Sequence, residues 1–284
     1  MRILKIFFIC NLLLLVSCDF DITGFFVSPS ATIEERYVES MELNSSNPSD
    51  TIIEVLQENY TIYMCGDIHV INTADNLAQF IEIAKADSSA AFSIILGDIT
   101  DQKGGMEIAY DTIQKHTTED FILKTIVGNH DLYFNQWEVY KELFGSGIYS
   151  FAVQTPTAKD LYIILDSGSG TLGSKQLQWF EELLSSSRDS YRHCFVFSHT
   201  NMWAENFSQF PSGLFSIEES AKISNILSQY SVNYYFNGHV HYRSTTTLND
   251  VEYVTLDEML DGSDRASYVI VNVEDAINYD FYEL

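Results

Sequence analysis

Five short stretches of the sequence carry the side chains best suited to chemistry. Each holds carboxylate, carboxamide or imidazole groups, and together they contain five of the seven histidines of the chain. This concentration of histidines needs a chemical reason. The stretches are Asp67-Ile68-His69, Gly97-Asp98-Ile99-Thr100-Asp101, Gly128-Asn129-His130-Asp131, Ser198-His199 and Gly238-His239-Val240-His241.

A short apolar run precedes each stretch. The runs are too short for helices and do not alternate between apolar and polar residues, which is typical of strands covered on both faces in a parallel sheet. In open α/β sheets, ligands bind beyond the carboxyl ends of the strands, so we expect the five stretches to line one crevice. The runs are residues 63–65, 92–96, 125–127, 195–197 and 234–236.

The spacing within two of the stretches supports this prediction. Asp67 and His69 are two residues apart, and so are His239 and His241. Residues two apart point the same way in an extended chain, so each pair could direct both of its side chains at the site.

The rest of the chain from residue 60 alternates helices with strands. Residues 148–153 and 161–166 are expected to be antiparallel neighbours, and a capping box at Ser216 and Glu219 is expected to open the last helix. The pattern predicts an α/β fold, a two-sheet sandwich with flanking helices, in one domain over residues 58–284. Helices are predicted over 73–86, 105–116, 136–144, 174–184 and 216–230, and short late strands near 243–248, 252–256, 266–273 and 277–283.

The acidic composition limits what the protein can bind. Fifteen basic against forty acidic residues give a formal net charge of −25 in a chain of 284 residues. Such a surface repels nucleic acid, so no nucleic-acid partner is expected, and an anionic substrate would need cationic help from metal ions. Solubility outside the cell is the main reason that we expect for the charge. Cys65 and Cys194 lie in apolar runs and are expected to be core residues without a disulfide.

The N-terminus is predicted to be an export signal. Residues 1–17 combine a basic start with an apolar stretch that is too short to span a bilayer. Leu15-Val16-Ser17-Cys18 resembles a bacterial lipobox, which implies that Cys18 is lipidated and anchors an exported lipoprotein to a membrane, on the periplasmic or outer face. The alternative is an ordinary cleavable signal with an incidental cysteine. Residues 18–57 are predicted to be the lipidated cysteine and a flexible tether.

The five stretches gain specificity from their order. Singly, each motif is common, and an isolated buried histidine is more often a core residue than a ligand. Together they resemble the signature of the calcineurin-like metallophosphoesterase family, over roughly residues 60–260. Residues 149–180 are similar to single-domain members near the class III cyclic-nucleotide phosphodiesterases and the purple acid phosphatases. The resemblance implies a four-layer α/β/β/α sandwich of two mixed sheets with flanking helices, as in metallo-dependent phosphatases.

The resemblance also implies two divalent or mixed-valence metal ions, each held by four side chains, with one carboxylate bridging them. The metals could be Mn, Fe, Zn or Ni. The implied ligands are Asp67, His69, Asp98 and His241 for one metal and Asp98, Asn129, His199 and His239 for the other, with Asp98 as the bridge.

Three further residues receive implied roles around the metals. His130 would donate to the phosphate and protonate the leaving oxygen, Asp101 would orient His130, and Asp131 would support the ligands from behind. A solvated turn residue is the alternative for Asp101. The implied reaction is in-line attack of a metal-bridging hydroxide on a phosphate ester.

These expectations favour a membrane-tethered phosphoesterase that acts on small phosphate mono- or diesters such as nucleotides. The alternatives are an enzyme for lipid or cell-envelope phosphodiesters, a catalytically idle metal-binding lipoprotein, and a metal-stabilised structural protein. Thr200 and Asn201 stand where many cyclic-nucleotide relatives have His and Pro, which weakens the expectation of a cyclic nucleotide. The aromatic loop over residues 200–211 is predicted either to wall the site or to be a packed surface loop.

Overall fold

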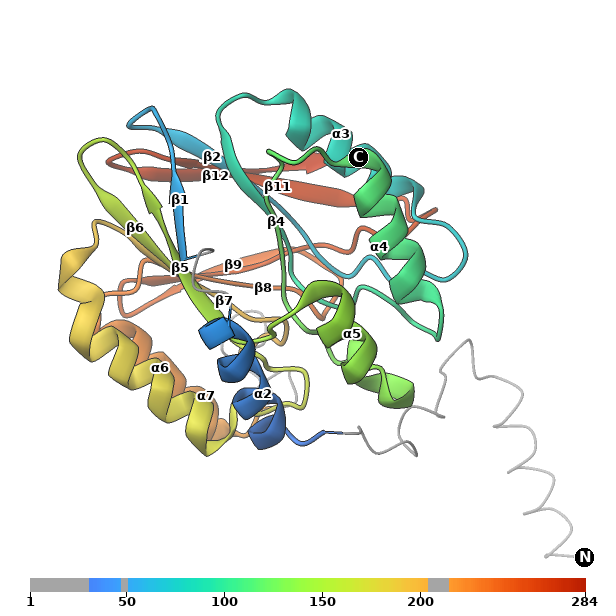
Figure 1. Cartoon of the computed structure of the whole chain (residues 1–284). Coiled ribbons are helices and arrows are strands. Elements are labelled where there is room, and N and C mark those ends of the chain that lie inside the picture. The colour runs from blue at the N-terminus through green and yellow to red at the C-terminus, as the bar shows by residue number, and fades with distance from the viewer. Residues whose placement is uncertain (1–30, 47–50, 204–214) are drawn as a thin grey trace, which may run out of the picture.

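Two mixed β-sheets form the centre of the computed structural model, which describes residues 31–46, 51–203 and 215–284 (Figure 1). The seven-stranded sheet has the order β1-β5-β6-β7-β8-β10-β9, and the five-stranded sheet has the order β12-β11-β2-β3-β4. The strands of the first sheet are β1 (Ile52–Glu54), β5 (Tyr149–Gln154), β6 (Lys159–Ile164), β7 (Cys194–Phe197), β8 (Tyr234–Asn237), β10 (Val251–Thr255) and β9 (Ser244–Leu248). Those of the second are β12 (Ile277–Glu283), β11 (Ser267–Val273), β2 (Tyr60–Cys65), β3 (Ala90–Ile95) and β4 (Leu123–Thr125).

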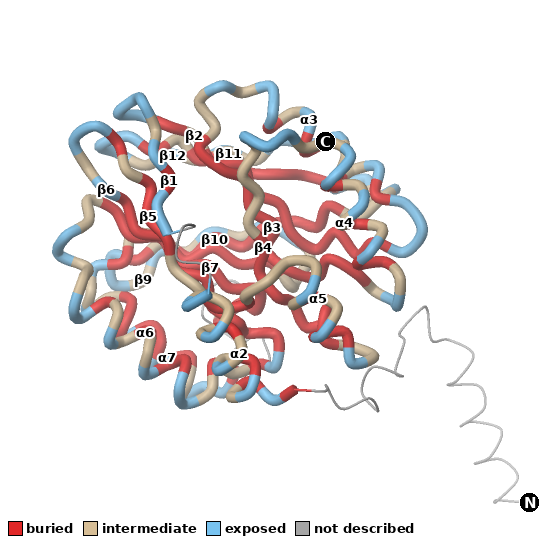
Figure 2. Tube along the Cα trace, in the orientation of Figure 1, coloured by how far each residue is buried: buried red, intermediate tan, exposed pale blue. Residues whose placement is uncertain are grey.

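Helices cover the outer face of each sheet (Figure 1). One apolar core lies between the five-stranded sheet and its helices, a second between the seven-stranded sheet and its helices, and a third between the two sheets. Figure 2 shows the strands as the buried centre of the molecule. The predicted α/β/β/α sandwich is therefore confirmed. The helices are α3 (Asp75–Ala86), α4 (Gly105–His116) and α5 (Trp137–Phe144) on the smaller sheet, and α6 (Gly173–Ser187) and α7 (Ile217–Gln229) on the larger.

Parallel pairing brings the ends of the central strands together. β2, β3 and β4 run parallel in one sheet, and β6, β7 and β8 run parallel in the other. On β2, Ile62 and Met64 face the core between the sheets, whereas Tyr63 and Cys65 face the helical side. Because both faces are buried, these strands read as continuous apolar runs, as the sequence indicated.

Most predicted elements are found within a few residues of their expected bounds. β5 and β6 are antiparallel neighbours, as predicted, and the described cysteines, Cys65 and Cys194, are buried free thiols. The expected capping box is only half formed. Ser216 Oγ accepts from the N–H of Glu219 at 3.2 Å, but the Glu219 carboxylate instead accepts from Thr171 Oγ1 at 2.9 Å.

The prediction of a flexible tether over residues 18–57 is wrong for its described parts. Helix α2 (Ile33–Ser46) packs on α6 and β5, and β1 pairs in parallel with β5. Helix α2 lacks a broad apolar stripe and instead buries Arg36, which pairs with Asp166. Hydrophobic periodicity therefore missed it. Thr32 and Glu35 do form a reciprocal capping box, the one local signal that marks its start.

The predicted export signal, the lipidated Cys18 and the rest of the tether lie outside the described residues, as does most of the loop after His199. Within residues 31–46, 51–203 and 215–284, none of the helices combines the length and the apolar character needed to cross a bilayer.

Candidate metal centre

The predicted ligands lie on sharply bent backbone. Asp67, His69, Asp98, His239 and His241 all have positive φ, at 50°, 44°, 49°, 76° and 61°. This left-handed conformation is uncommon outside glycine, and residues held in it cluster at functional sites. The argument from two-residue spacing assumed that the Asp-x-His and His-x-His pairs are extended, and this assumption is wrong. Tight turns after the strands direct their side chains instead.

Two glycines make room for the carboxylates. A Cβ at Gly128 would lie 2.2 Å from Asp98 Oδ1, and one at Gly238 would lie 2.3 Å from Asp67 Oδ2. Both distances are far inside van der Waals contact, so only glycine fits at these two positions. The N–H of His239 also donates to Asp67 Oδ2 at 3.0 Å. The backbone therefore approaches the carboxylates closely and holds them in place.

The first cluster consists of Asp67, His69, Asp98 and His241. One possible ligand atom from each of the four residues lies within 4.8 Å of those of the others. His241 Nε2 is 3.4 Å from Asp67 Oδ1, and His69 Nε2 is 3.8 Å from Asp98 Oδ2. His69 Nε2 and His241 Nε2 approach to 3.0 Å, so two ring nitrogens point at the same place.

The second cluster consists of Asp98, Asn129, His199 and His239. Asp98 Oδ2 lies 3.2 Å from His199 Nε2. Asn129 Oδ1 lies 3.0 Å from His199 Nε2 and 2.9 Å from His239 Nδ1. The other ring nitrogen of His199, Nδ1, lies 2.8 Å from the carbonyl oxygen of Leu96, which fixes the orientation of this ring.

The two clusters together fit two metal ions. Their donors are carboxylate and carboxamide oxygens and imidazole nitrogens, which is a set that Mn, Fe, Zn or Ni accepts. Asp98 belongs to both clusters, where a bridging carboxylate would have to lie. The structure thus brings together all seven residues expected from the sequence to be ligands, in the expected two groups.

Two of the predicted histidine ligands contact a carboxylate through the ring nitrogen that faces away from the first cluster. Asp101 Oδ1 lies 2.6 Å from His69 Nδ1, and Glu258 Oε2 lies 3.0 Å from His241 Nδ1. A carboxylate on one ring nitrogen sets the tautomer and the orientation of a histidine, so that the other nitrogen faces the metal. The Nε2 atoms of both rings accordingly face the first cluster.

His130 lies beside the clusters rather than in them. Its Nδ1 is 2.6 Å from Asp101 Oδ1, so Asp101 contacts His130 as expected and also contacts His69. Its Nε2 is 3.9 Å from Asp98 Oδ2, and the side chain is 31% exposed. The ring of Tyr133 packs on His130, with the two ring centroids 4.6 Å apart. The imidazole of His130 is thus partly exposed beside the clusters.

Asp131 ties two of the bent loops together. It is fully buried, and Oδ1 accepts from the N–H of Ile99 at 2.8 Å, while Oδ2 accepts from the N–H of Gly128 at 2.8 Å. Burial, together with the nearby charge of Asp98, raises the pKa of Asp131 to about 7. Its carboxylate therefore joins the loop that follows Asp98 to the loop that carries Asn129.

The side chains of the clusters are strongly coupled in charge. Burial disfavours the ionised Asp98, but His199 and His69 hold its pKa well below the usual range. Burial opposes protonation of both histidines, yet Asp98 raises the pKa of His199 to about 10, and Asp101 and Asp98 raise that of His69 to about 9. Burial and the neighbouring His199 lower the pKa of His239 to about 4. A dense group of opposite charges of this kind is typical of a functional site.

Sequence reasoning missed three residues that contact the site. They are Glu258 on His241, Tyr133 on His130 and Ser167, whose Oγ accepts from the N–H of His199 at 3.1 Å. Glu258 and Ser167 are far from their partners in the sequence and are brought close only by the fold, whereas Tyr133 lies three residues after His130, a spacing that could have indicated the contact.

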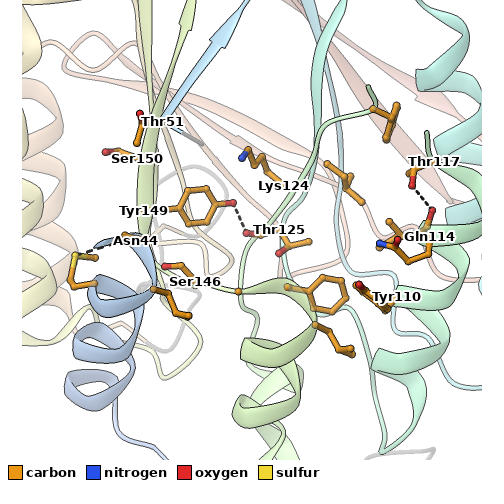
Figure 3. Close-up of a pocket in the computed structure, with 18 of the residues that line it drawn as sticks. Asn44, Thr51, Tyr110, Gln114, Thr117, Lys124, Thr125, Ser146, Tyr149 and Ser150 are labelled. Carbon is orange, nitrogen blue, oxygen red and sulfur yellow. Dashed lines mark hydrogen bonds between the residues drawn. The ribbon is translucent and has the colours of Figure 1, made fainter. Parts of the chain in front are cut away.

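A cavity of about 600 Å³ lies apart from these residues (Figure 3). Its lining comes mainly from α2, α4, α5, β4 and β5, with Trp179 of α6, and it includes none of the predicted ligands. Tyr149 donates from its hydroxyl to the carbonyl of Thr125 at 2.9 Å in this region, and Asn44 donates to the carbonyl of Ile148 at 2.8 Å. These polar groups are already hydrogen-bonded within the protein. The cavity and the metal centre are therefore separate features.

The sequence model described as calcineurin-like phosphoesterase matches residues 60–243. Among solved structures, a dimetal phosphatase from Danio rerio superposes with a TM-score of 0.59 at 14% identity, over 78% of this chain and 95% of that one. A purple acid phosphatase from yellow lupin gives 0.61 at 13% identity, over 80% of this chain and 52% of that one. GAP50, described as the anchor in the inner membrane complex of Plasmodium, gives 0.57 at 13% identity, over 80% and 85%. At these identities the structures show a shared fold. No match to this chain was found among curated proteins.

Proposed function

The chain belongs to the calcineurin-like phosphoesterase family of metal-dependent phosphoester hydrolases, and we propose that it hydrolyses small, nucleotide-like phosphate mono- or diesters at the two clusters. The observation that carries the proposal is the place of Asp98. Its carboxylate lies in both clusters, 3.2 Å from His199 Nε2 on one side and 3.8 Å from His69 Nε2 on the other.

The two clusters would hold two metal ions, one each, with Asp98 shared between them. When bound, the ions supply positive charge to phosphoryl oxygens and lower the pKa of a water molecule. The protein itself would position the side chains that bind the ions. The tight turns, together with Gly128 and Gly238, hold the carboxylates, and Asp101 and Glu258 fix the rings of two histidines.

His130 is the group that we assign to proton transfer. Asp101 Oδ1 faces its Nδ1 at 2.6 Å, which leaves Nε2 directed away from Asp101 and available to donate to the oxygen of the leaving group. The hydrogen bonds and charges of His130 and His69 outweigh burial and keep the pKa of Asp101 well below its usual range. Asp101 therefore stays ionised at neutral pH and orients His130 through its negative charge.

The idle-binder alternative draws support from the fold it would share with GAP50, which is described as an anchor. The complete donor set argues for catalysis, because a binding module has no need of His130 held by Asp101 beside the two clusters. An enzyme for envelope or lipid phosphodiesters would use the same site. It would differ from the proposed hydrolase of small esters only in its substrate.

The experiment uses the full chain, purified in detergent and supplied with Mn²⁺. Hydrolysis of p-nitrophenyl phosphate and of bis(p-nitrophenyl) phosphate is measured for the wild type and for Asp98→Asn. We expect metal-dependent turnover that Asp98→Asn abolishes together with metal binding. Asp111→Asn, at an exposed position of α4, is the matched control and should change neither. Full activity in Asp98→Asn would overturn the site, and a folded wild type that binds Mn²⁺ without turnover would favour the idle binder.

We also propose that the protein is an exported lipoprotein anchored to a membrane through Cys18. The proposal rests on the basic start, the apolar stretch and the Leu15–Cys18 sequence. Metabolic labelling with a fatty acid should mark the wild type and leave Cys18→Ser unlabelled. Equal labelling of the two proteins would contradict it.

A further inference from the structure

Glu258 lies beyond the residues that the family model matches, on the loop between β10 and β11. Its Oε2 is 3.0 Å from Nδ1 of His241, and its side chain is only 10% exposed. The other oxygen, Oε1, accepts from Ser263 Oγ at 2.6 Å and from Arg265 Nη2 at 3.2 Å. Both carboxylate oxygens are therefore engaged, which is what a nearly buried carboxylate requires.

The backbone around Glu258 is fastened to the same site. The N–H of Met259 lies 3.1 Å from the carbonyl of Gly66 and 3.2 Å from that of Asp67. The carbonyl of Glu258 accepts from the N–H of Ser267 at 3.3 Å. The loop thus joins the turn that carries Asp67 to the ring of His241, two members of the first cluster.

The contact has a chemical consequence for His241. A neutral imidazole carries one proton, and a carboxylate at Nδ1 holds the proton there. The lone pair of Nε2 then faces Asp67 Oδ1 at 3.4 Å, where a metal ligand is needed. The His241 side chain is 36% exposed, so packing restrains its ring less than it would restrain a buried ring.

We propose that Glu258 is a positioning residue that sets the tautomer and orientation of His241, and through them the metal affinity of the first cluster. The inference rests on the proposed dinuclear site. Its effect should fall on the first cluster, because the side chain of Glu258 contacts His241, Ser263 and Arg265 among the described residues, whereas His199 of the second cluster is held by the carbonyl of Leu96. Loss of an outer partner of this kind lowers metal affinity about 10–100-fold.

The test is a Mn²⁺ titration of the full chain in detergent by calorimetry, with metal content measured after dialysis. We expect two bound ions in the wild type. In Glu258→Ala, one ion should bind as before and the other about 10–100-fold more weakly. Glu258→Gln keeps a neutral acceptor and should show a smaller loss. Turnover of Glu258→Ala should recover when Mn²⁺ is raised, because the substitution weakens loading rather than the chemistry.

Asp257→Asn is the matched control. This neighbouring carboxylate holds Arg243 Nε at 2.5 Å and Ser267 Oγ at 2.9 Å and touches no predicted ligand. It should leave both affinities unchanged. Wild-type affinities in Glu258→Ala, or an equal loss of both ions in Glu258→Ala and Asp257→Asn, would overturn the proposal. Metal binding is measured without substrate, so a wild type that loads two ions but fails to hydrolyse esters would remove the proposed function and leave this inference standing.

Discussion

Arg36 and Asp166 form a buried ion pair across 130 residues of sequence. Arg36 Nε donates to Asp166 Oδ2 at 2.7 Å and Nη2 to Oδ1 at 3.1 Å, and neither side chain is exposed. Ser167, the next residue, holds the N–H of His199 through its hydroxyl. Through Asp166 and the adjacent Ser167, helix α2 is therefore linked to the backbone of His199, a predicted ligand of the second cluster.

Arg36→Met should destabilise the fold by roughly 3–5 kcal/mol, because it leaves the carboxylate of Asp166 buried without its partner. Urea denaturation of the full chain measures the change. Lys85→Met is the control, since Lys85 pairs with Glu82 at the surface with side chains 31% and 51% exposed, and its loss should cost less than about 1 kcal/mol. Equal effects of the two substitutions would contradict the role of the buried pair.

His130→Ala should lower turnover by roughly 10²–10⁴ while the metal content stays at the wild-type level. The reason is that the imidazole of His130 lies beside the two clusters, with its Nδ1 2.6 Å from Asp101 Oδ1 and its Nε2 3.9 Å from Asp98 Oδ2. Turnover and metal content are measured on the same preparation. If metal were lost together with the rate, His130 would have to be a ligand.

Gly128→Ala should lower turnover at least about 100-fold and reduce metal loading, because the new Cβ would displace Asp98, which lies 2.2 Å from it. Gly147→Ala is the control, since its Cβ would meet Trp137 only at an ordinary 3.4 Å. Metal content and turnover are compared for both variants. A wild-type metal content in Gly128→Ala would show that the turn can shift without displacing the Asp98 carboxylate, and would contradict the prediction.

Asp261 should stabilise the fold above about pH 4 and lose its effect in acid. Its carboxylate accepts from the Thr73 hydroxyl at 2.6 Å and caps α3 through the N–H of Asn76 at 2.8 Å. Burial opposes ionisation, but these bonds lower the pKa of Asp261 below its usual value. A lowered pKa in the folded state gives stability that is present above the unfolded value and lost as pH falls through the folded one.

Asp261→Ala should therefore cost about 1 kcal/mol at pH 7, the usual value of a helix cap. At pH 3 and below, the difference from the wild type should shrink. Chemical denaturation at the two pH values gives both numbers. A difference that is the same at pH 7 and pH 2 would mean that the charge of Asp261 has no part in the cap.

The sequence predicted the parts of the site that follow local rules. Asp98 and His199 could be placed because each follows a buried apolar strand, and parallel strands end at one edge. Glu258 could not be placed, because its contact with His241 depends on the path of the loop between β10 and β11. Helix α2 was missed for a different reason: its buried face includes Arg36 and Ser40, which no apolar pattern reveals.

Asp101 serves two imidazoles with a single oxygen atom, 2.6 Å from Nδ1 of His69 and 2.6 Å from Nδ1 of His130. Replacing any one of the three changes what the other two can do, so the effects of their substitutions should not add. One carboxylate oxygen therefore ties the proposed metal ligand His69 to the proposed proton donor His130, so metal binding and proton transfer would share a single point of failure.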